Sequence, residues 1–488
     1  MKKKVIIIGS GFSSLSASCY LAQAGYEVEI FEKNSTIGGR ARQLKRDGFT
    51  FDIGPTWYWM PDVFERFFAD FNTTPQEFYE LIKLSPAYKV YFSKEESITI
   101  GDTLEKIYAA FEDIEKGSSK KLKKFIDKAK DNYDIAIKDL VYRPGVSPLE
   151  LITPKTATKL NQFFSTIAKE VRSEFKNEKL IQVLEFPVLF LGAKPSDTPA
   201  FYSFMNFADF GLGTWHPKGG MYQVILGLEK LATSLGVKIQ LNASAEKILV
   251  NDKDEATGII SNGKEYPADI VLSGADYHHT ETLLDKKYRQ YSETYWDKKT
   301  FAPSSLLFYV AFDKKVKNVE HHTLFFDVDF KAHAKAIYDT AQWPEDPLFY
   351  ASFPSKTDHN IAPEGKEAAI FLIPLAPGLK DDPSLRERYF EKIMTRFEKI
   401  TDQNMTNYVI FKESFCVNDF VKEYNSYKGN AYGLANTLFQ TAFLRPKLKS
   451  KKVKKLYFTG QLTVPGPGVP PALISGKLVA ELIKKQKL

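Results

Sequence analysis

The chain has 488 residues, enough for two or three domains, and 43% of them are hydrophobic, as in a protein with a buried core. Its net charge is only +7 and it contains no recognisable nucleic-acid-binding motif, so no nucleic-acid partner is expected. Two cysteines, Cys19 and Cys416, do not make a disulfide framework and suit a reducing cytoplasm, and no apolar run approaches the ~20 residues that span a bilayer.

A short apolar strand opens the chain over residues 5–8 and runs into a glycine turn and a helix over 12–24. Gly9 permits the tight turn, Gly11 lets the backbone approach a pyrophosphate, and the N-terminus of the helix presents free N–H groups to phosphate. Ser14 stands where the third glycine of this pattern usually falls, and it is small enough to allow close packing of helix on strand. Alone, the pattern is a weak sign of a dinucleotide site, with an incidental strand–turn–helix as the alternative.

The next segments strengthen the nucleotide interpretation. A second strand over 26–31 ends at Glu32, and an acidic residue there accepts hydrogen bonds from a ribose diol and disfavours the 2′-phosphate of NADP. Gly38-Gly39-Arg40 follows, in which glycines allow close backbone approach and arginine offers a cationic fork to phosphate. With this turn, this glutamate and G-G-R, the sequence resembles the superfamily of flavin-dependent amine oxidases and carotenoid desaturases.

The resemblance implies that the cofactor is FAD and that no metal is required. It implies that Gly39 and Arg40 approach the diphosphate, that Gly54-Pro55-Thr56 passes beside the isoalloxazine ring, and that the main chain at Lys247 contacts adenine. Cys416 lies outside the matching motifs, so we expect non-covalent binding. The residues assigned to the cofactor are Gly9, Gly11, Phe12, Ser13, Ser14, Glu32, Lys33, Gly39, Arg40, Gly54, Pro55, Thr56, Lys247, Gly460, Gln461, Gly468 and Val469.

Further elements of a nucleotide-binding domain are predicted later in the chain. The segment 268–276 resembles the family strand that returns to the Rossmann sheet. Near the end, a strand leading to Gly460-Gln461 and the helix after Gly468-Val469 resemble the closing motif of the family, whose helix N-terminus faces the flavin edge that becomes negative on reduction. The other predicted elements are a helix over 224–235, strands over 237–241, 247–250 and 256–261, the last two in a hairpin-like meander, and a helix over 472–485.

These elements predict an α/β fold with a Rossmann-like FAD-binding domain of the GR2 flavoprotein type, assembled from discontinuous segments. An inserted mixed α+β domain is expected to bind the substrate and contact the membrane. We assign residues 1–75, 218–290 and 450–488 to the FAD-binding domain and residues 76–217 and 291–449 to the inserted domain.

The inserted part is rich in aromatic residues, which indicates either ordinary core or an apolar tunnel for a long hydrocarbon. Its segment Trp215 to Met221 resembles the W-x-P-x-G-G-M of carotenoid desaturases, and Gly54 to Pro61 is most similar to phytoene desaturases. The resemblance implies hydride transfer from a long hydrophobic carotenoid to flavin N5, with a quinone or oxygen as the electron acceptor. His216 is the one candidate for a catalytic group, and an exposed loop histidine is the alternative.

Three other functions stay open at this stage. A desaturase of a hydroxylated carotenoid, acting by 3,4-desaturation, is close to the phytoene type. A flavin amine oxidase is disfavoured because Gln461 replaces the acidic residue common there and no flavin-linking cysteine lies in a matching motif. A non-catalytic flavoprotein or carotenoid carrier belongs to a different class, and anaerobic bleaching of the flavin by substrate would separate it from an enzyme.

A water-insoluble carotenoid must be collected from a bilayer, so we expect a cytoplasmic protein bound peripherally to the inner face of the membrane. The segment 118–140 predicts an amphipathic helix with a basic face that can lie on anionic lipid, and an ordinary surface helix is the alternative. Its apolar residues are Leu122, Phe125, Ile126, Ala129, Tyr133 and Ile137, and its basic face carries Lys120, Lys121, Lys123, Lys124, Lys128 and Lys130.

Overall fold

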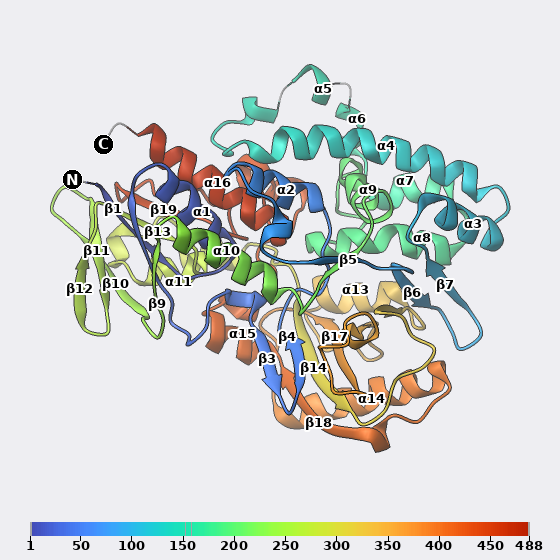
Figure 1. Ribbon diagram of the computed structural model, residues 1–488. Helices are drawn as coiled ribbons and strands as arrows, with labels where there is room; N and C mark the ends of the chain where they lie inside the picture. Colours follow the sequence, from blue (N-terminus) through green and yellow to red (C-terminus); the bar gives the residue numbers. More distant parts are fainter. Residues whose placement is uncertain (1, 152, 158, 487–488) are drawn as a thin grey trace.

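The computed structural model describes residues 2–151, 153–157 and 159–486, and a five-stranded parallel sheet forms the left part of the molecule in Figure 1. The strand order is β19-β13-β1-β2-β9, so segments from both ends and the middle of the chain meet in one sheet. Residues 5–8 of the central strand are apolar because they are buried on both faces of the sheet. The strands are β1 Lys4–Ile8, β2 Glu27–Phe31, β9 Lys238–Gln240, β13 Ile270–Ser273 and β19 Leu456–Phe458.

Helices α1 (Phe12–Gln23) and α16 (Val469–Lys485) pack closely beside this sheet, and α10 (Tyr222–Ser234) packs against α1. The contact between α1 and α16 requires Gly476, because a Cβ there would lie 2.4 Å from the main-chain oxygen of Ser13. Ser14 is accommodated in the same way, because a Cβ on Gly274 would lie 2.0 Å from the Ser14 hydroxyl. Gly274, just after β13, therefore leaves room for the Ser14 side chain, so that the turn does not need a glycine at position 14.

A small antiparallel sheet follows the expected meander. Strands β10 (Ala245–Val250), β11 (Ala256–Ser261) and β12 (Lys264–Pro267) pair in chain order, and they cover the side of the parallel sheet on which Ile6 and Val271 lie. The predicted hairpin is confirmed, with one strand more than the sequence pattern indicated.

A seven-stranded mixed sheet forms the lower right of the molecule (Figure 1). Its order is β18-β14-β17-β16-β15-β6-β7, and all neighbours are antiparallel except β15 and β6. One face, including Phe308 and Phe371, packs against α14 (Pro383–Thr401). The strands are β6 Tyr88–Tyr91, β7 Ser97–Ile100, β14 Ser304–Phe312, β15 His322–Phe325, β16 Phe349–Ser352, β17 Glu367–Leu375 and β18 Val409–Phe415.

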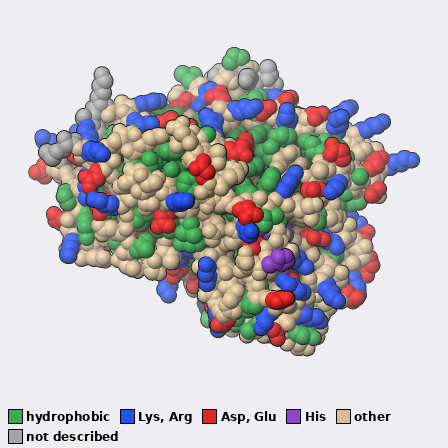
Figure 2. All heavy atoms as spheres, in the orientation of Figure 1, with side chains coloured by type: hydrophobic (Ala, Val, Ile, Leu, Met, Phe, Trp, Pro, Cys, Tyr) green, Lys and Arg blue, Asp and Glu red, His purple; other side chains and the backbone are tan. Residues whose placement is uncertain are grey.

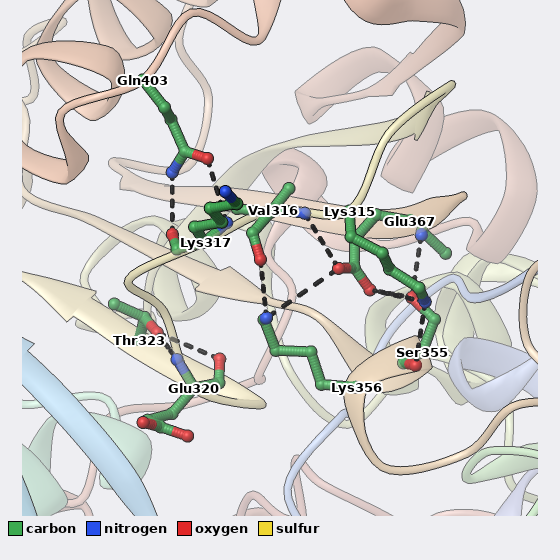
Figure 3. A network of polar contacts seen from close by, with 10 residues as sticks. Lys315, Val316, Lys317, Glu320, Thr323, Ser355, Lys356, Glu367 and Gln403 are labelled. Atoms are coloured by element: carbon green, nitrogen blue, oxygen red, sulfur yellow. Dashed lines mark hydrogen bonds and ion pairs between the residues drawn. The ribbon is translucent and has the colours of Figure 1, made fainter. Parts of the chain in front are cut away.

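A buried carboxylate at the start of β17 binds two neighbouring loops, as Figure 3 shows. Glu367, at the start of β17, is fully buried and accepts hydrogen bonds from the Val316 N–H (3.1 Å) and the Ser355 hydroxyl. The ammonium groups of Lys315 and Lys356 lie 3.6 and 3.9 Å from its oxygens. The two loops that carry these residues are thereby tied to the strand.

A helical layer covers the upper right of Figure 1, and its longest member is α4 (Ser118–Lys138). The predicted helix is confirmed, but its apolar residues, from Leu122 to Ile137, are 0–5% exposed and pack on the protein's own core. The structure therefore favours the surface-helix alternative, because no apolar face of α4 is free to enter lipid. The other helices of the layer are α3 Leu104–Ile114, α5 Pro154–Ala157, α6 Leu160–Phe164, α7 Ile167–Glu174, α8 Glu178–Glu185 and α9 Phe204–Phe210.

The remaining elements connect these layers. Among the described residues, none of the helices has the length and apolar character needed to cross a membrane. The connecting elements are β3 Gln43–Arg46, β4 Phe49–Asp52, α2 Pro61–Ala69, β5 Leu81–Lys83, β8 Trp215–Pro217, α11 Tyr277–Thr282, α12 Glu293–Asp297, α13 Phe330–Tyr338 and α15 Val417–Tyr424.

Candidate active site

One large cavity, of about 1130 Å³, lies between the two main sheets. At one end it is lined by the loops that follow β1, β2 and β13, which is the carboxyl edge of the parallel sheet. At the other it is lined by one face of the seven-stranded sheet and by aromatic residues of the helical layer. Open α/β sheets bind ligands at their carboxyl edge, so this cavity is the candidate active site.

The glycine turn forms the floor of the cavity's first end. Gly9 has a φ of +84°, which favours glycine, and no atom lies within 4 Å of the position that a Cβ on Gly11 would take. Gly39 packs against the turn, since its Cβ would lie 3.4 Å from the Cα of Gly11. Helix α1 starts directly after it, with no acidic residue in its first turn and no side-chain cap. This end is a cradle of backbone N–H groups that suits an anionic group.

Glu32 projects into the same end of the cavity from the end of β2 and is 3% exposed. One carboxylate oxygen accepts hydrogen bonds from the Ser10 N–H (2.9 Å) and hydroxyl (2.7 Å), and the other from the Asn34 N–H (2.9 Å) and side-chain amide (3.0 Å). The protein therefore fixes this carboxylate before any ligand arrives.

Arg40 lines the cavity beside the turn. Its Nη2 donates to the Ser426 hydroxyl (3.0 Å) and the Asn430 carbonyl (3.4 Å), while its buried Nε has no protein acceptor. Burial lowers the pKa of Arg40, although the carboxylate of Asp276 opposes that shift. Gly54 must be glycine here, because a Cβ would lie 2.1 Å from the Arg40 carbonyl oxygen. A buried N–H without an acceptor fits a phosphate oxygen as its partner.

The C-terminal segment closes this end. Gly460 and Gln461 line the cavity just after β19, and Gly468, with a φ of +115°, leads into the N-terminus of α16 at Val469. This helix is longer at its start than the sequence pattern indicated, because two prolines fit its first turn.

Most residues that the sequence assigned to the cofactor line this cavity, although their role as ligands stays a prediction. Ser14 instead lies behind the turn, against Gly274. Lys247 extends to the surface, 3.6 Å from the Asp285 carboxylate, while Ser244 and Ala245 beside it line the cavity. The lining residues from the sequence assignment are Gly9, Gly11, Phe12, Ser13, Glu32, Lys33, Gly39, Arg40, Gly54, Pro55, Thr56, Gly460, Gln461, Gly468 and Val469.

His216 occupies neither of its two expected positions. It is 2% exposed on β8, so it is not an exposed loop histidine, and it is not among the described residues that line the cavity. Its Nε2 lies 3.7 Å from the Asp358 carboxylate and its ring centroid 4.7 Å from that of His321. The pairing of β8 with β5 turns the side chain into the protein, which the local sequence could not indicate.

The second end of the cavity has an aromatic wall around Trp57. Trp57 stacks on the His322 ring at a centroid distance of 4.0 Å, and Phe186 and Trp59 complete the wall. The Tyr350 hydroxyl lies 2.6 Å from His322 Nδ1 and 2.9 Å from the Thr56 hydroxyl. Burial holds the pKa of His322 well below its usual range, so the ring is neutral. Such a wall recognises shape and apolar surface rather than charge.

Several lining residues were missed by the sequence analysis. Asp276 and His279 at the start of α11, and Tyr424 and Asn425 at the end of α15, join the first end of the cavity. Asp276 ends the segment 268–276, and Tyr424 and Asn425 begin the segment 424–434, which also resembles carotenoid desaturases, so both motifs gave a signal without assigning these residues to the site. Cys19 and Cys416 are buried, and neither is among the described lining residues.

Comparison with known proteins agrees with this geometry. The family model described as flavin containing amine oxidoreductase matches residues 12–484. The chain belongs to this family. Over 98% of its length it is 39% identical to the carotenoid 3,4-desaturase of Haloarcula japonica, covering 97% of that protein. It is 30% identical to the zeta-carotene-forming phytoene desaturase of Myxococcus xanthus, over 98% of this chain and 93% of that one.

A solved oxidoreductase structure from Methanosarcina mazei shares the fold, with a TM-score of 0.65 and 19% identity over 99% of this chain and all of the other. The protein is therefore a flavin-dependent oxidoreductase of the carotenoid desaturase group, and its α/β fold with a Rossmann-like domain is confirmed. The glycine cradle, the fixed Glu32 carboxylate and the free Arg40 Nε–H fit a flavin dinucleotide at the first end of the cavity.

Proposed function

We propose that this protein is a carotenoid desaturase that uses non-covalently bound FAD and introduces a double bond into a long polyene. The observation that carries the proposal is that one large cavity joins the glycine turn after β1 to an aromatic chamber. An amine oxidase must attract a cationic substrate, whereas the described chamber walls around Trp57 are formed by Trp59, Phe186 and Tyr350, and the histidine stacked on Trp57, His322, is neutral. Residues 1–75, 218–290 and 450–488 would form the FAD-binding domain and the rest the substrate domain.

The proposed desaturation is of the 3,4 type. The 39% identity to the carotenoid 3,4-desaturase, against 30% to the phytoene desaturase, supports this choice over the phytoene type that the Gly54 to Pro61 motif favours. Phytoene desaturation stays the second candidate because that motif is intact and lines the cavity from Gly54 to Thr56.

In this proposal the flavin supplies the two-electron oxidation by accepting a hydride from the substrate. The chain's own residues hold and orient both partners. Backbone N–H groups at Gly11 and the N-terminus of α1 would hold the diphosphate, Glu32 the ribose, and Gly54 to Thr56 the edge of the ring. The aromatic chamber excludes water and aligns the polyene.

Product analysis tests the proposal. The purified flavoprotein would receive, in separate liposome reactions, a 1-hydroxylated carotenoid with a saturated 3,4 bond, phytoene, or an aliphatic amine, with a quinone as the electron acceptor. We expect desaturation of the hydroxylated carotenoid and no oxidation of the amine. Desaturation of phytoene alone would select the second candidate, and amine oxidation without carotenoid products would overturn the proposal.

We also propose that the cavity mouth docks on a lipid bilayer, with an apolar rim formed by Val146, Leu149, Phe164, Phe439 and Leu444. These side chains are 39–78% exposed, and the last three also line the cavity. Figure 2 shows hydrophobic side chains at the top of the molecule, where α5 and α6 lie. Exposed apolar groups around an apolar opening are expected where a hydrocarbon passes directly from lipid to protein.

Liposome flotation tests the rim. Replacing Phe164 and Phe439 with serine should release the protein from vesicles of anionic and neutral lipid. The matched control is serine at Tyr408 and Ile410, which are 39% and 42% exposed but do not line the cavity, and this variant should float like the wild type. Equal flotation of all three proteins would exclude the rim as the docking surface.

A further inference from the structure

Arg445 is a fully buried cation, 2% exposed, that lies behind the C-terminal wall of the cavity. Its Nη1 donates to the Gln461 carbonyl (3.2 Å), and its Nη2 donates to the Leu434 carbonyl (2.9 Å) and the Asn436 side-chain oxygen. Its buried Nε has no protein partner. Every acceptor is an uncharged oxygen.

No carboxylate in the described part of the chain forms an ion pair with Arg445. Burial lowers its pKa to about 10, and the charged forms of Tyr202 and Tyr295 are the only groups that act against this shift. At neutral pH the guanidinium is therefore still charged. Taking a cation out of water costs several kcal/mol, and proteins ordinarily recover that cost with a paired acid. An unpaired buried cation is expected where negative charge develops during function.

The position of Arg445 indicates which group would acquire the negative charge that the guanidinium stabilises. Two of its acceptors belong to Gln461 and Asn436, which line the cavity. A Cβ on Gly466 would lie 3.1 Å from its Nη2, so the guanidinium packs directly against the loop between β19 and α16. This loop and the N-terminus of α16 line the cavity, and the family resemblance implies that this helix N-terminus faces the flavin edge.

We propose that Arg445 sets the reduction potential of the bound flavin, by stabilising the negative charge that the ring acquires when it is reduced. Removing two hydrogens from a polyene transfers two electrons and one proton to the flavin as hydride, and the second proton leaves the neighbouring carbon as the new double bond forms. The reduced ring then holds one negative charge. A cation one residue layer away, in a medium of low dielectric constant, favours that state and makes the flavin more oxidising.

The inference rests on the flavin placement of the proposed function, and its test needs no carotenoid. The reduction potential of the bound flavin would be measured against reference dyes in wild type, Arg445→Gln and Arg445→Lys. We expect a more negative potential in the Gln variant and a smaller change in the Lys variant, which keeps the charge but not the hydrogen bonds. The control is Arg386→Gln, which removes a partly buried cation paired with the buried Asp381 beside the seven-stranded sheet and should leave the potential unchanged.

Several outcomes are decisive. A Gln variant with full flavin and an unchanged potential overturns the inference. If the Gln variant does not fold, the Lys variant provides the test. As the pH rises through the pKa of the buried lysine, the flavin reduction potential of this variant must fall more steeply than that of the wild type, because the positive charge is lost. Parallel dependence of the two potentials on pH overturns the inference. A protein that shows the shift but desaturates no carotenoid refutes the proposed function and keeps the role of Arg445. A wild type that binds no flavin overturns both.

Discussion

The two main sheets contribute to the cavity in different ways. The parallel sheet contributes mainly main-chain groups. The turn after β1 presents N–H groups, and charged side chains such as Glu32, Arg40 and Asp276 lie close by. The seven-stranded sheet offers side chains from one face, such as Leu307, Leu324 and Tyr350, while its other face packs on α14. A ligand held by backbone needs glycines at fixed spacings, whereas a ligand held by shape needs only apolar volume. The first requirement is visible in a sequence and the second is not.

The largest expected effect comes from breaking the backbone cradle. Gly11→Val places a branched side chain in space that is open in the structure and that the proposed pyrophosphate fills. We expect the purified variant to carry no flavin while its circular dichroism spectrum stays that of the wild type. Full flavin absorbance in the variant would show that the dinucleotide binds elsewhere.

The seven-stranded sheet can be destabilised without changing the glycine turn that is proposed to bind the dinucleotide. Glu367→Ala leaves Lys315 and Lys356 without their buried carboxylate and removes an acceptor from the Val316 N–H. The Lys315 and Lys356 side chains are 46% and 24% exposed, so the main cost is the lost hydrogen bonds to the buried carboxylate, about 1.5–3 kcal/mol each, which should appear as a lower midpoint in urea unfolding. Flavin affinity of the folded fraction should not change, and a loss of affinity would mean that the two sheets are coupled more closely than this comparison implies.

Asp52 joins the two regions, because it lies on β4 and accepts hydrogen bonds from the N–H groups of Met221 (2.7 Å) and Tyr222 (3.2 Å) at the start of α10. Burial raises its pKa to about 6. A raised carboxyl pKa stabilises the fold below pH ~4, and this contribution is lost as the pH rises towards 6. Relative to Asp52→Asn, the wild type should lose about 2–3 kcal/mol of unfolding free energy between pH 4 and 7. Identical pH dependence of urea unfolding in both proteins would contradict the shift.

The smallest effect is expected at Glu32, whose carboxylate is proposed to bind the ribose next to the backbone N–H groups of the glycine turn. Glu32→Ala removes the proposed ribose acceptor, and charged hydrogen bonds are worth about 1.5–3 kcal/mol each, so flavin affinity should fall at least tenfold. The Ser10 and Asn34 groups that Glu32 binds should turn to water without unfolding the protein. Flavin titration of the apoprotein measures this loss, and wild-type affinity would rule out Glu32 as the ribose ligand.

Local sequence predicted much of the parallel sheet correctly because its signals are local. The strand over 5–8, the helix from Phe12 and the meander over 247–261 follow from apolar runs, glycines and turn residues within a few positions of each other. The resemblance of separated motifs then indicated that distant segments meet. The motifs could not indicate that the Lys247 side chain faces solvent, because the orientation of a side chain on β10 depends on how that strand packs in the folded protein.

By itself, the sequence indicated the family and predicted a backbone cradle for a dinucleotide, since glycine spacing constrains the backbone directly and an acidic residue after the second strand suits a ribose. Only the tertiary structure decided which side chains the substrate meets and which remain covered. It buried the apolar face of α4, turned His216 away from the cavity, and placed the unpaired charge of Arg445 behind the cavity wall. The physical reason is that burial is a property of neighbours far apart in the chain, and a residue's own sequence context does not contain them.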